Sequence, residues 1–177
     1  LDYAILVING MDGVQSHTDT LWKLLKRYEI PTFIFVNKMD MEGTDKDAVF
    51  QNIRKKLDGD CVDFSSGDRD EQIAMADERL LDTYLDSGMV EVEDIIEAIL
   101  DRKIFPCFWG SALKLSGVQE LLDAMNTYMV MPAYNAEFGG RIFKISRDAK
   151  GERLTYMKVT GGSLKCREQI EGTEGKV

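Results

Sequence analysis

Residues 32–40 have the sequence TFIFVNKMD, and this stretch decides the fold. Its first five residues are β-branched or aromatic, which predicts a short strand buried on both faces of a sheet. The polar residues Asn37, Lys38 and Asp40 follow this strand directly. Ligands of open α/β sheets bind at the carboxyl ends of the strands. The stretch therefore predicts a buried strand that delivers polar side chains to a ligand site.

Strands and helices alternate on both sides of this stretch. Residues 3–8 form a continuous apolar run, which predicts a strand at the centre of a sheet, buried on both faces. The spacing of apolar residues predicts helices at about 16–28 and 45–57. Farther along, residues 104–109 predict another strand and residues 118–129 another helix. This alternation indicates an α/β fold with a mostly parallel sheet.

A charged segment interrupts the alternation between residues of about 60 and 102. Residues 61–66 are too few to assign to a structure. Residues 70–85 and 91–100 have helical periodicity and are heavily charged. We interpret the segment as a helical insertion whose acidic surface is either solvated or a docking face for another protein.

The sequence changes character after Pro132. Residues 140–146 and 154–160 alternate in hydrophobicity around a Gly-containing turn, and the SLKCRE run that follows has strand length. We therefore predict two domains, an α/β domain over residues 1–132 and the start of an antiparallel β-barrel over residues 137–177. The barrel portion is shorter than a small barrel needs, and Leu1 opens directly into a strand, so we interpret the chain as a fragment.

Composition excludes several classes of function. Acidic residues outnumber basic ones by 31 to 22, and the net charge of −9 repels phosphate backbones, so a DNA partner is not expected. The three cysteines, Cys61, Cys107 and Cys166, are far apart and lack a metal-ligand spacing, so no metal site is assigned. No apolar run is long enough for a membrane span. A reduced, cytoplasmic protein fits these observations.

The polar residues after the strand at 32–36 suit guanine recognition. The carboxylate of Asp40 can accept two parallel hydrogen bonds from a ring N–H and an amino group, which guanine offers on one edge and adenine does not. The stem of Lys38 can lie across a purine face. Asn37 can bridge the base and neighbouring loops, because its amide both donates and accepts.

A second loop, Gly110-Ser111-Ala112-Leu113-Lys114, follows the strand predicted at 104–109. Small residues let backbone N–H groups approach a ligand, and the amide of Ala112 suits the purine oxygen. The alternative is that both segments are ordinary polar turns. Two such loops at neighbouring strand ends favour a shared binding crevice.

Three segments together resemble translational GTPases, specifically elongation factor G and the tetracycline-resistance ribosomal protection proteins. They are YAILVINGMDGVQSHTDTLWKLLKRYEIPTFIFVNKMD (3–40), GSALKLSGVQELLDAM (110–125) and GRIFKISRDAKGERLTYMKVTGGSLKCRE (140–168). The resemblance implies the C-terminal half of a P-loop-type G domain that binds GTP or GDP. It implies that Asn37, Lys38 and Asp40 form the guanine-specificity loop. It further implies that Ser111, Ala112 and Leu113 form the second base-contacting loop.

The resemblance also implies what this chain lacks. No GxxxxGK[ST] stretch is present, and the family's phosphate loop, magnesium ligands and catalytic His belong upstream of residue 1. No catalytic residue or magnesium ligand is therefore assigned here, and His17 is interpreted as a surface or capping residue. The intact protein is expected to be a GTPase that couples hydrolysis to movement on the ribosome, whereas this chain alone is expected to be inactive.

Two alternative functions remain open at this point. The intact protein could instead release tetracycline from the ribosome, or it could be a ribosome-binding module without hydrolysis. The expected partners are guanine nucleotide, ribosomal RNA and ribosomal proteins. Lys and Arg gather after residue 140, where they either face ribosomal RNA or protect strand edges from aggregation.

Overall fold

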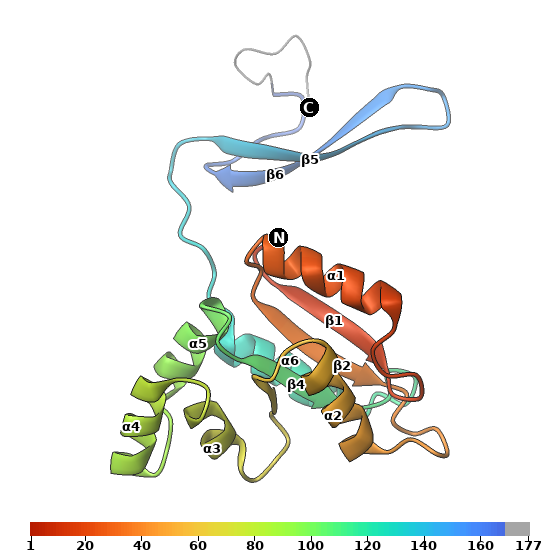
Figure 1. Ribbon diagram of the computed structural model, residues 1–177. Coiled ribbons are helices and arrows are strands. Elements are labelled where there is room, and N and C mark those ends of the chain that lie inside the picture. Colours follow the sequence, from red (N-terminus) through yellow and green to blue (C-terminus); the bar gives the residue numbers. More distant parts are fainter. Residues whose placement is uncertain (169–177) are drawn as a thin grey trace. The chain divides into compact units, whose positions relative to one another are not determined.

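A computed structural model describes residues 1–168 of the chain. The chain divides into two compact units, one of residues Leu1–Val130 and the other beginning at Met131. Figure 1 shows the helices and strands of both.

The first unit is built on a four-stranded parallel sheet with the order β1-β2-β4-β3. The strands are β1 (Ala4–Asn9), β2 (Thr32–Asn37), β3 (Cys61–Asp63) and β4 (Phe105–Trp109). The predicted α/β class with a mostly parallel sheet is confirmed. Strand β3 falls within residues 61–66, whose sequence is too short to predict a structure.

Within the described residues the first strand does not lie at the sheet centre that its apolar run predicts. Strand β1 lies at one edge of the described sheet, and β2 rather than β1 is buried on both faces. Leu6 and Ile8 face the core, whereas Ile5 and Val7 are 42% and 58% exposed. An apolar run alone does not distinguish these cases, because the neighbours of the strand decide whether its second face is covered.

Helices α1 (Ser16–Arg27) and α2 (Lys46–Lys56) cover one face of the sheet. Trp22 of α1 is buried there, and its indole Nε1 donates to the backbone carbonyl of Leu57 just after α2 at 3.0 Å. The carboxylate of Asp45 caps α2 by accepting from two backbone amides of the first turn. These two bonds fix the residue at which α2 begins.

The other face packs against the remaining helices of the unit. These are α3 (Arg69–Ala74), α4 (Glu78–Ser87), α5 (Val92–Leu100) and α6 (Val118–Tyr128). The prediction of one helix over residues 70–85 is wrong, because the chain breaks into α3 and α4. Asp77 begins α4 by accepting from the backbone amide of Arg79 at 3.0 Å, which makes a new N-cap inside the predicted helix.

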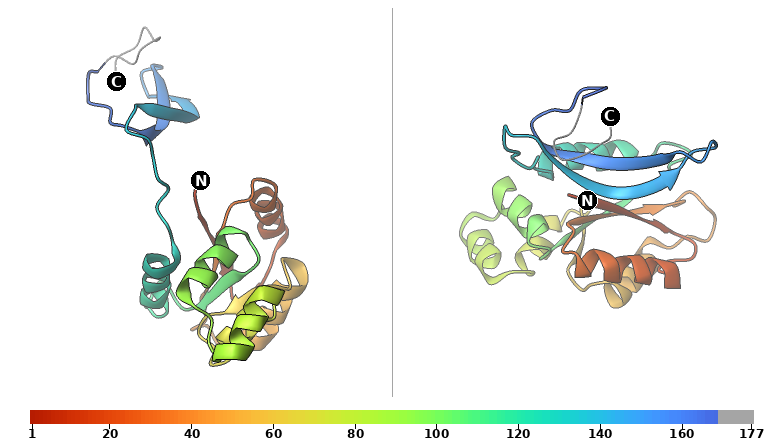
Figure 2. Two further views of the ribbon diagram at one scale, coloured as in Figure 1. Left: turned by 90° about the vertical axis from the view of Figure 1, so that its left-hand side faces the viewer. Right: turned by 90° about the horizontal axis from the view of Figure 1, so that it is seen from above.

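The second unit contains an antiparallel pair of strands, β5 (Gly139–Arg147) and β6 (Arg153–Gly161). The two strands run side by side in the right-hand view of Figure 2. Residues 163–168 form no strand, so the strand length of SLKCRE is misleading. The assignment to a β-barrel stays a prediction, and its part beyond residue 168 lies outside the described residues.

None of the helices within residues 1–168 is both long and apolar enough to cross a bilayer.

Candidate functional site

Two loops meet at the carboxyl ends of β2 and β4. The backbone amide of Gly110 donates to the carbonyl of Val36 at 2.9 Å, and the amide of Met39 donates to the carbonyl of Gly110 at 3.0 Å. The loop after β1 joins them, because the amide of Gly10 donates to the carbonyl of Asn37 at 2.8 Å. The structure thus brings the two sequence-predicted loops together at one edge of the sheet.

Asn37 connects the two loops through its side chain. Its Oδ1 accepts from the backbone amide of Lys38 at 2.8 Å and from that of Ala112 at 2.9 Å. In this structure, therefore, the Ala112 amide predicted to contact a purine oxygen is paired with Asn37. A ligand oxygen that accepts from the Ala112 amide has to share that hydrogen bond with Asn37 or replace it. Such an exchange costs less free energy than leaving a buried amide without a partner.

Asp40 has partners in the second loop. The Ser111 hydroxyl forms a hydrogen bond with the carboxylate of Asp40, and Nζ of Lys114 lies 3.0 Å from its Oδ2. These two bonds hold the pKa of Asp40 below its ordinary value. Asp40 is therefore ionised at neutral pH. Its carboxylate can accept hydrogen bonds from a cationic group or from the N–H groups of a ligand.

The remaining predicted site residues differ in exposure. Ser111 is only 2% exposed, so its hydroxyl acts on Asp40 from beneath the loop. Leu113 is 92% exposed at the outer end of the second loop. Lys38 is exposed and has a left-handed backbone with φ of 65°, which costs about 1–2 kcal/mol for a residue with a side chain. The loop predicted to read the base therefore contains a strained residue. Backbone strain of this kind is common at functional sites.

Two glycines allow the second loop to fold back on β4. A Cβ added to Gly110 would lie 2.1 Å from the carbonyl oxygen of Ser116. A Cβ added to Gly117 would lie 1.9 Å from the carbonyl oxygen of Trp109, and Gly117 has φ of 72°. Any side chain at these positions would separate the backbone segments that carry the loop.

Next to Asp40 the surface is hollowed by about 400 Å³. Met39 and Asp40 line this hollow from the first loop, Gly110 from the second, and Lys46 from α2. The charged groups around it come from different segments of the chain. Its position beside the Asp40 carboxylate makes the loop edge accessible to a ligand.

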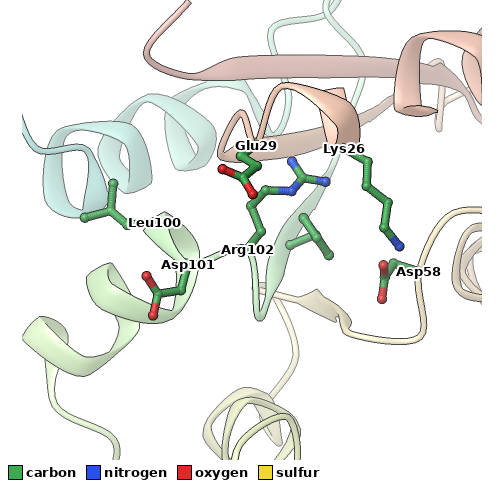
Figure 3. A pocket seen from close by; sticks show the side chains of 7 residues that line it. Lys26, Glu29, Asp58, Leu100, Asp101 and Arg102 are labelled. Carbon is green, nitrogen blue, oxygen red and sulfur yellow. The ribbon is translucent and has the colours of Figure 1, made fainter. Parts of the chain in front are cut away.

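A second pocket, of about 440 Å³, lies at the other ends of β2 and β4, where these strands begin (Figure 3). The guanidinium of Arg102 lies there between aromatic rings, 5.1 Å from the centroid of Trp22 and 4.9 Å from that of Phe105. It also donates to the backbone carbonyl of Ile30 and to Thr32. These contacts tie Arg102 to the frame of the sheet, away from the loops.

Lys114 is the site residue to which sequence reasoning assigns no role. It belongs to the same GSALK segment as the predicted base-contacting residues. Its spacing from Asp40 along the chain gives no signal of an ion pair, because the pair forms only when β2 and β4 align.

Comparisons with known proteins identify related sequences and a related fold. The family described as elongation factor Tu GTP binding domain matches residues 1–131. Tetracycline resistance protein TetP of Clostridium perfringens is 32% identical over 97% of this chain and 30% of its own length. TetW of Butyrivibrio fibrisolvens is 30% identical over 96% of the chain and 30% of its length. A crystal structure of a protein from Thermus thermophilus matches with a TM-score of 0.73 and 20% identity, over 95% of this chain and 33% of that one.

The chain spans about 30% of the length of these curated relatives. At 20% identity, the similarity to the Thermus thermophilus structure concerns the fold alone.

The pKa of Asp40 tests the contacts between the two loops. Ser111→Ala and Lys114→Met are each expected to raise this pKa toward its ordinary value of 3.8, because each removes a hydrogen bond to the charged form. The pKa is measured from the carboxyl carbon shift in an NMR titration from about pH 2 to pH 6. Stability that Asp40 contributes is present above the unfolded pKa and is lost as the pH falls through the lower folded value.

Asp68 serves as the internal control in that titration. Ser66 and Gln72 lower its pKa, and neither is among the residues that shift the pKa of Asp40. An Asp40 pKa that stays at the parental value in both variants would contradict the contacts described here.

The close backbone approach at Gly117 gives a stability prediction. Gly117→Ala is expected to lower the free energy of unfolding by about 2–4 kcal/mol, since it combines a left-handed backbone with a collision against Trp109. Gly88→Ala is the matched control, because Gly88 has φ of 74° and nothing within 4 Å of an added Cβ. The control is expected to lose only about 1 kcal/mol in urea unfolding. If both variants lost the same free energy of unfolding, the loop would accommodate a side chain at position 117 without an additional energetic penalty.

Proposed function

Because the chain belongs to the translational GTPase family through its elongation factor Tu GTP-binding domain, we propose that it is the guanine-recognition part of a ribosome-associated translational GTPase. The resemblance found in the sequence is thereby confirmed at the level of the family. The observation that carries the proposal is the convergence of Asp40 and Ala112 at one edge of the sheet.

Guanine fits the groups at this edge. Its ring N–H and 2-amino group present two parallel donors, which match the ionised carboxylate of Asp40. Its carbonyl oxygen matches the backbone amide of Ala112. In this structure these groups pair with Lys114 and Asn37, so the base would exchange existing hydrogen bonds for new ones. Adenine offers the opposite pattern and would leave the Asp40 carboxylate facing an acceptor.

We assign the other site residues by their placement. The exposed stem of Lys38 would lie along the purine face, and Asn37 would hold the two loops at the right separation. The buried Ser111 would orient the carboxylate of Asp40, and Leu113 would lie at the outer rim of the base.

Hydrolysis of GTP is proposed for a longer protein that contains this chain. The sequence has no GxxxxGK[ST] stretch, whose hydroxyl would bind magnesium, so we propose that magnesium is held by other segments of that longer protein. Magnesium, when bound, neutralises charge on the phosphates. The proposed ribosomal partners place such a protein in the cytoplasm, in protein biosynthesis.

Two modes of action are compatible with this role. One couples GTP hydrolysis to translocation on the ribosome. The other, release of tetracycline from the ribosome, is favoured by the names of TetP and TetW, which are tetracycline resistance proteins. Protection of translation against tetracycline by the intact protein would favour the second mode, and tRNA movement without the drug the first.

Asp40→Asn tests the base assignment in a protein that joins this chain to a phosphate-binding segment. The variant is expected to bind GDP more weakly by roughly 2–4 kcal/mol, because the amide places a donor opposite the donors of guanine. Xanthosine diphosphate should gain affinity, since it has a carbonyl in place of the amino group. Calorimetric titration measures the affinities of variant and parent for both nucleotides. Equal GDP affinity in variant and parent would exclude Asp40 as the residue that reads the base.

The 177-residue chain itself is expected to show no GTP hydrolysis above a buffer control, with or without ribosomes. Phosphoryl transfer needs groups that position and neutralise the phosphates, and the sequence has no phosphate loop. GDP binding by the chain should be weak for the same reason. Phosphate release measured with labelled GTP decides this, and turnover that scales with the concentration of the chain would contradict it.

A further inference from the structure

A buried carboxylate lies beneath the two loops. Asp63, the last residue of β3, is 6% exposed. Its Oδ1 accepts from the amide and hydroxyl of Ser65, at 3.0 and 2.7 Å, and from the indole Nε1 of Trp109 at 2.9 Å. Its Oδ2 lies 2.6 Å from Nζ of Lys46. A charge at this depth is tolerated because both oxygens have partners.

The network keeps Asp63 charged. Burial acts to raise the pKa of Asp63, but the hydrogen bonds from Lys46, Ser65 and Trp109 outweigh burial and lower the pKa. The carboxylate therefore remains a fixed anion at neutral pH. Lys46 is drawn toward it and also lies 5.2 Å from the centroid of the Trp109 ring.

The partners of Asp63 stand at the bases of the two loops. Lys46 is the first residue of α2, which follows the loop that contains Asp40. Trp109 is the last residue of β4 and directly precedes Gly110 and the second loop. One carboxylate thus holds the end of one loop and the start of the other.

We propose that Asp63 is a positioning residue for base discrimination, which sets the separation of Asp40 and Ala112 through Lys46 and Trp109. The inference rests on the proposed function, because it concerns the same base site. If Lys46 is released, the start of α2 and the loop before it are free to move away from β4. Asp40 and the Ala112 amide would then no longer reach the N–H donors and the carbonyl oxygen of one guanine at the same time.

Asp63→Asn and Lys46→Met test this in the 177-residue chain. The Asn variant keeps an acceptor for Trp109 but removes the charge that holds Lys46. Lys103→Met is the matched control, because it removes another 2.6 Å ion pair, with Asp77, away from the loops. Lys46→Arg retains the positive charge beside Asp63, so this variant should behave like the parent.

Two NMR measurements separate positioning from general stability. The first is the amide shift of Ala112 without nucleotide. The second is the ratio of affinities for GDP and inosine diphosphate, which lacks the 2-amino group, in titrations at millimolar ligand. In Asp63→Asn and Lys46→Met the amide is expected to shift and the ratio to fall roughly three- to tenfold. In Lys103→Met both are expected to keep their parental values.

Either of two results would overturn the proposal. One is a parental Ala112 shift in both Asp63→Asn and Lys46→Met. The other is an equal change in Lys103→Met, which would indicate general destabilisation. If Asp63→Asn does not fold, the comparison of Lys46→Met with Lys46→Arg decides whether this ion pair positions the loops. A parent that shows no shifts with GDP would contradict the proposed guanine site, while the Ala112 shifts in the nucleotide-free variants would still decide the role of Asp63.

Discussion

The backbone bonds that cross from β2 to β4 are the constraint on which the site depends. The amide of Gly110 reaches the carbonyl of Val36, and the amide of Met39 returns to the carbonyl of Gly110. Parallel strands carry their ends to the same edge, so this pair of bonds aligns loops that are far apart in the sequence. The side-chain contacts of Asp40 and Asn37 with the second loop follow from that alignment.

Hydrophobic patterns predicted the elements that are buried from both sides. Residues 33–36 of β2 and 105–109 of β4 are all apolar and lie inside the sheet, so sequence and environment agree. The same pattern did not predict the exposed face of β1, since the exposure of Val7 depends on which elements cover it and not on its own sequence. It also missed the break between α3 and α4, because one capping carboxylate, Asp77, outweighs the helical periodicity around it.

The candidate site was predictable where its chemistry is local to a motif. Asn37, Lys38 and Asp40 follow one strand, and Ala112 follows another, so their types and places can be inferred from the sequence. The role of Asp63 could not be, because a lone acidic residue in a short segment has no periodicity or spacing that indicates burial. Its importance arises from three partners that come together around it only in the folded sheet.

Strand β1 has one further property that concerns the behaviour of the chain in solution. Among the described residues its outer edge pairs with no other strand, and Ile5 and Val7 expose apolar surface beside that edge. Neither proline nor charge interrupts the strand between Ala4 and Asn9. Open edges of this kind recruit further strands. We therefore expect that edge to pair with a further strand, from the same polypeptide or from another copy of it.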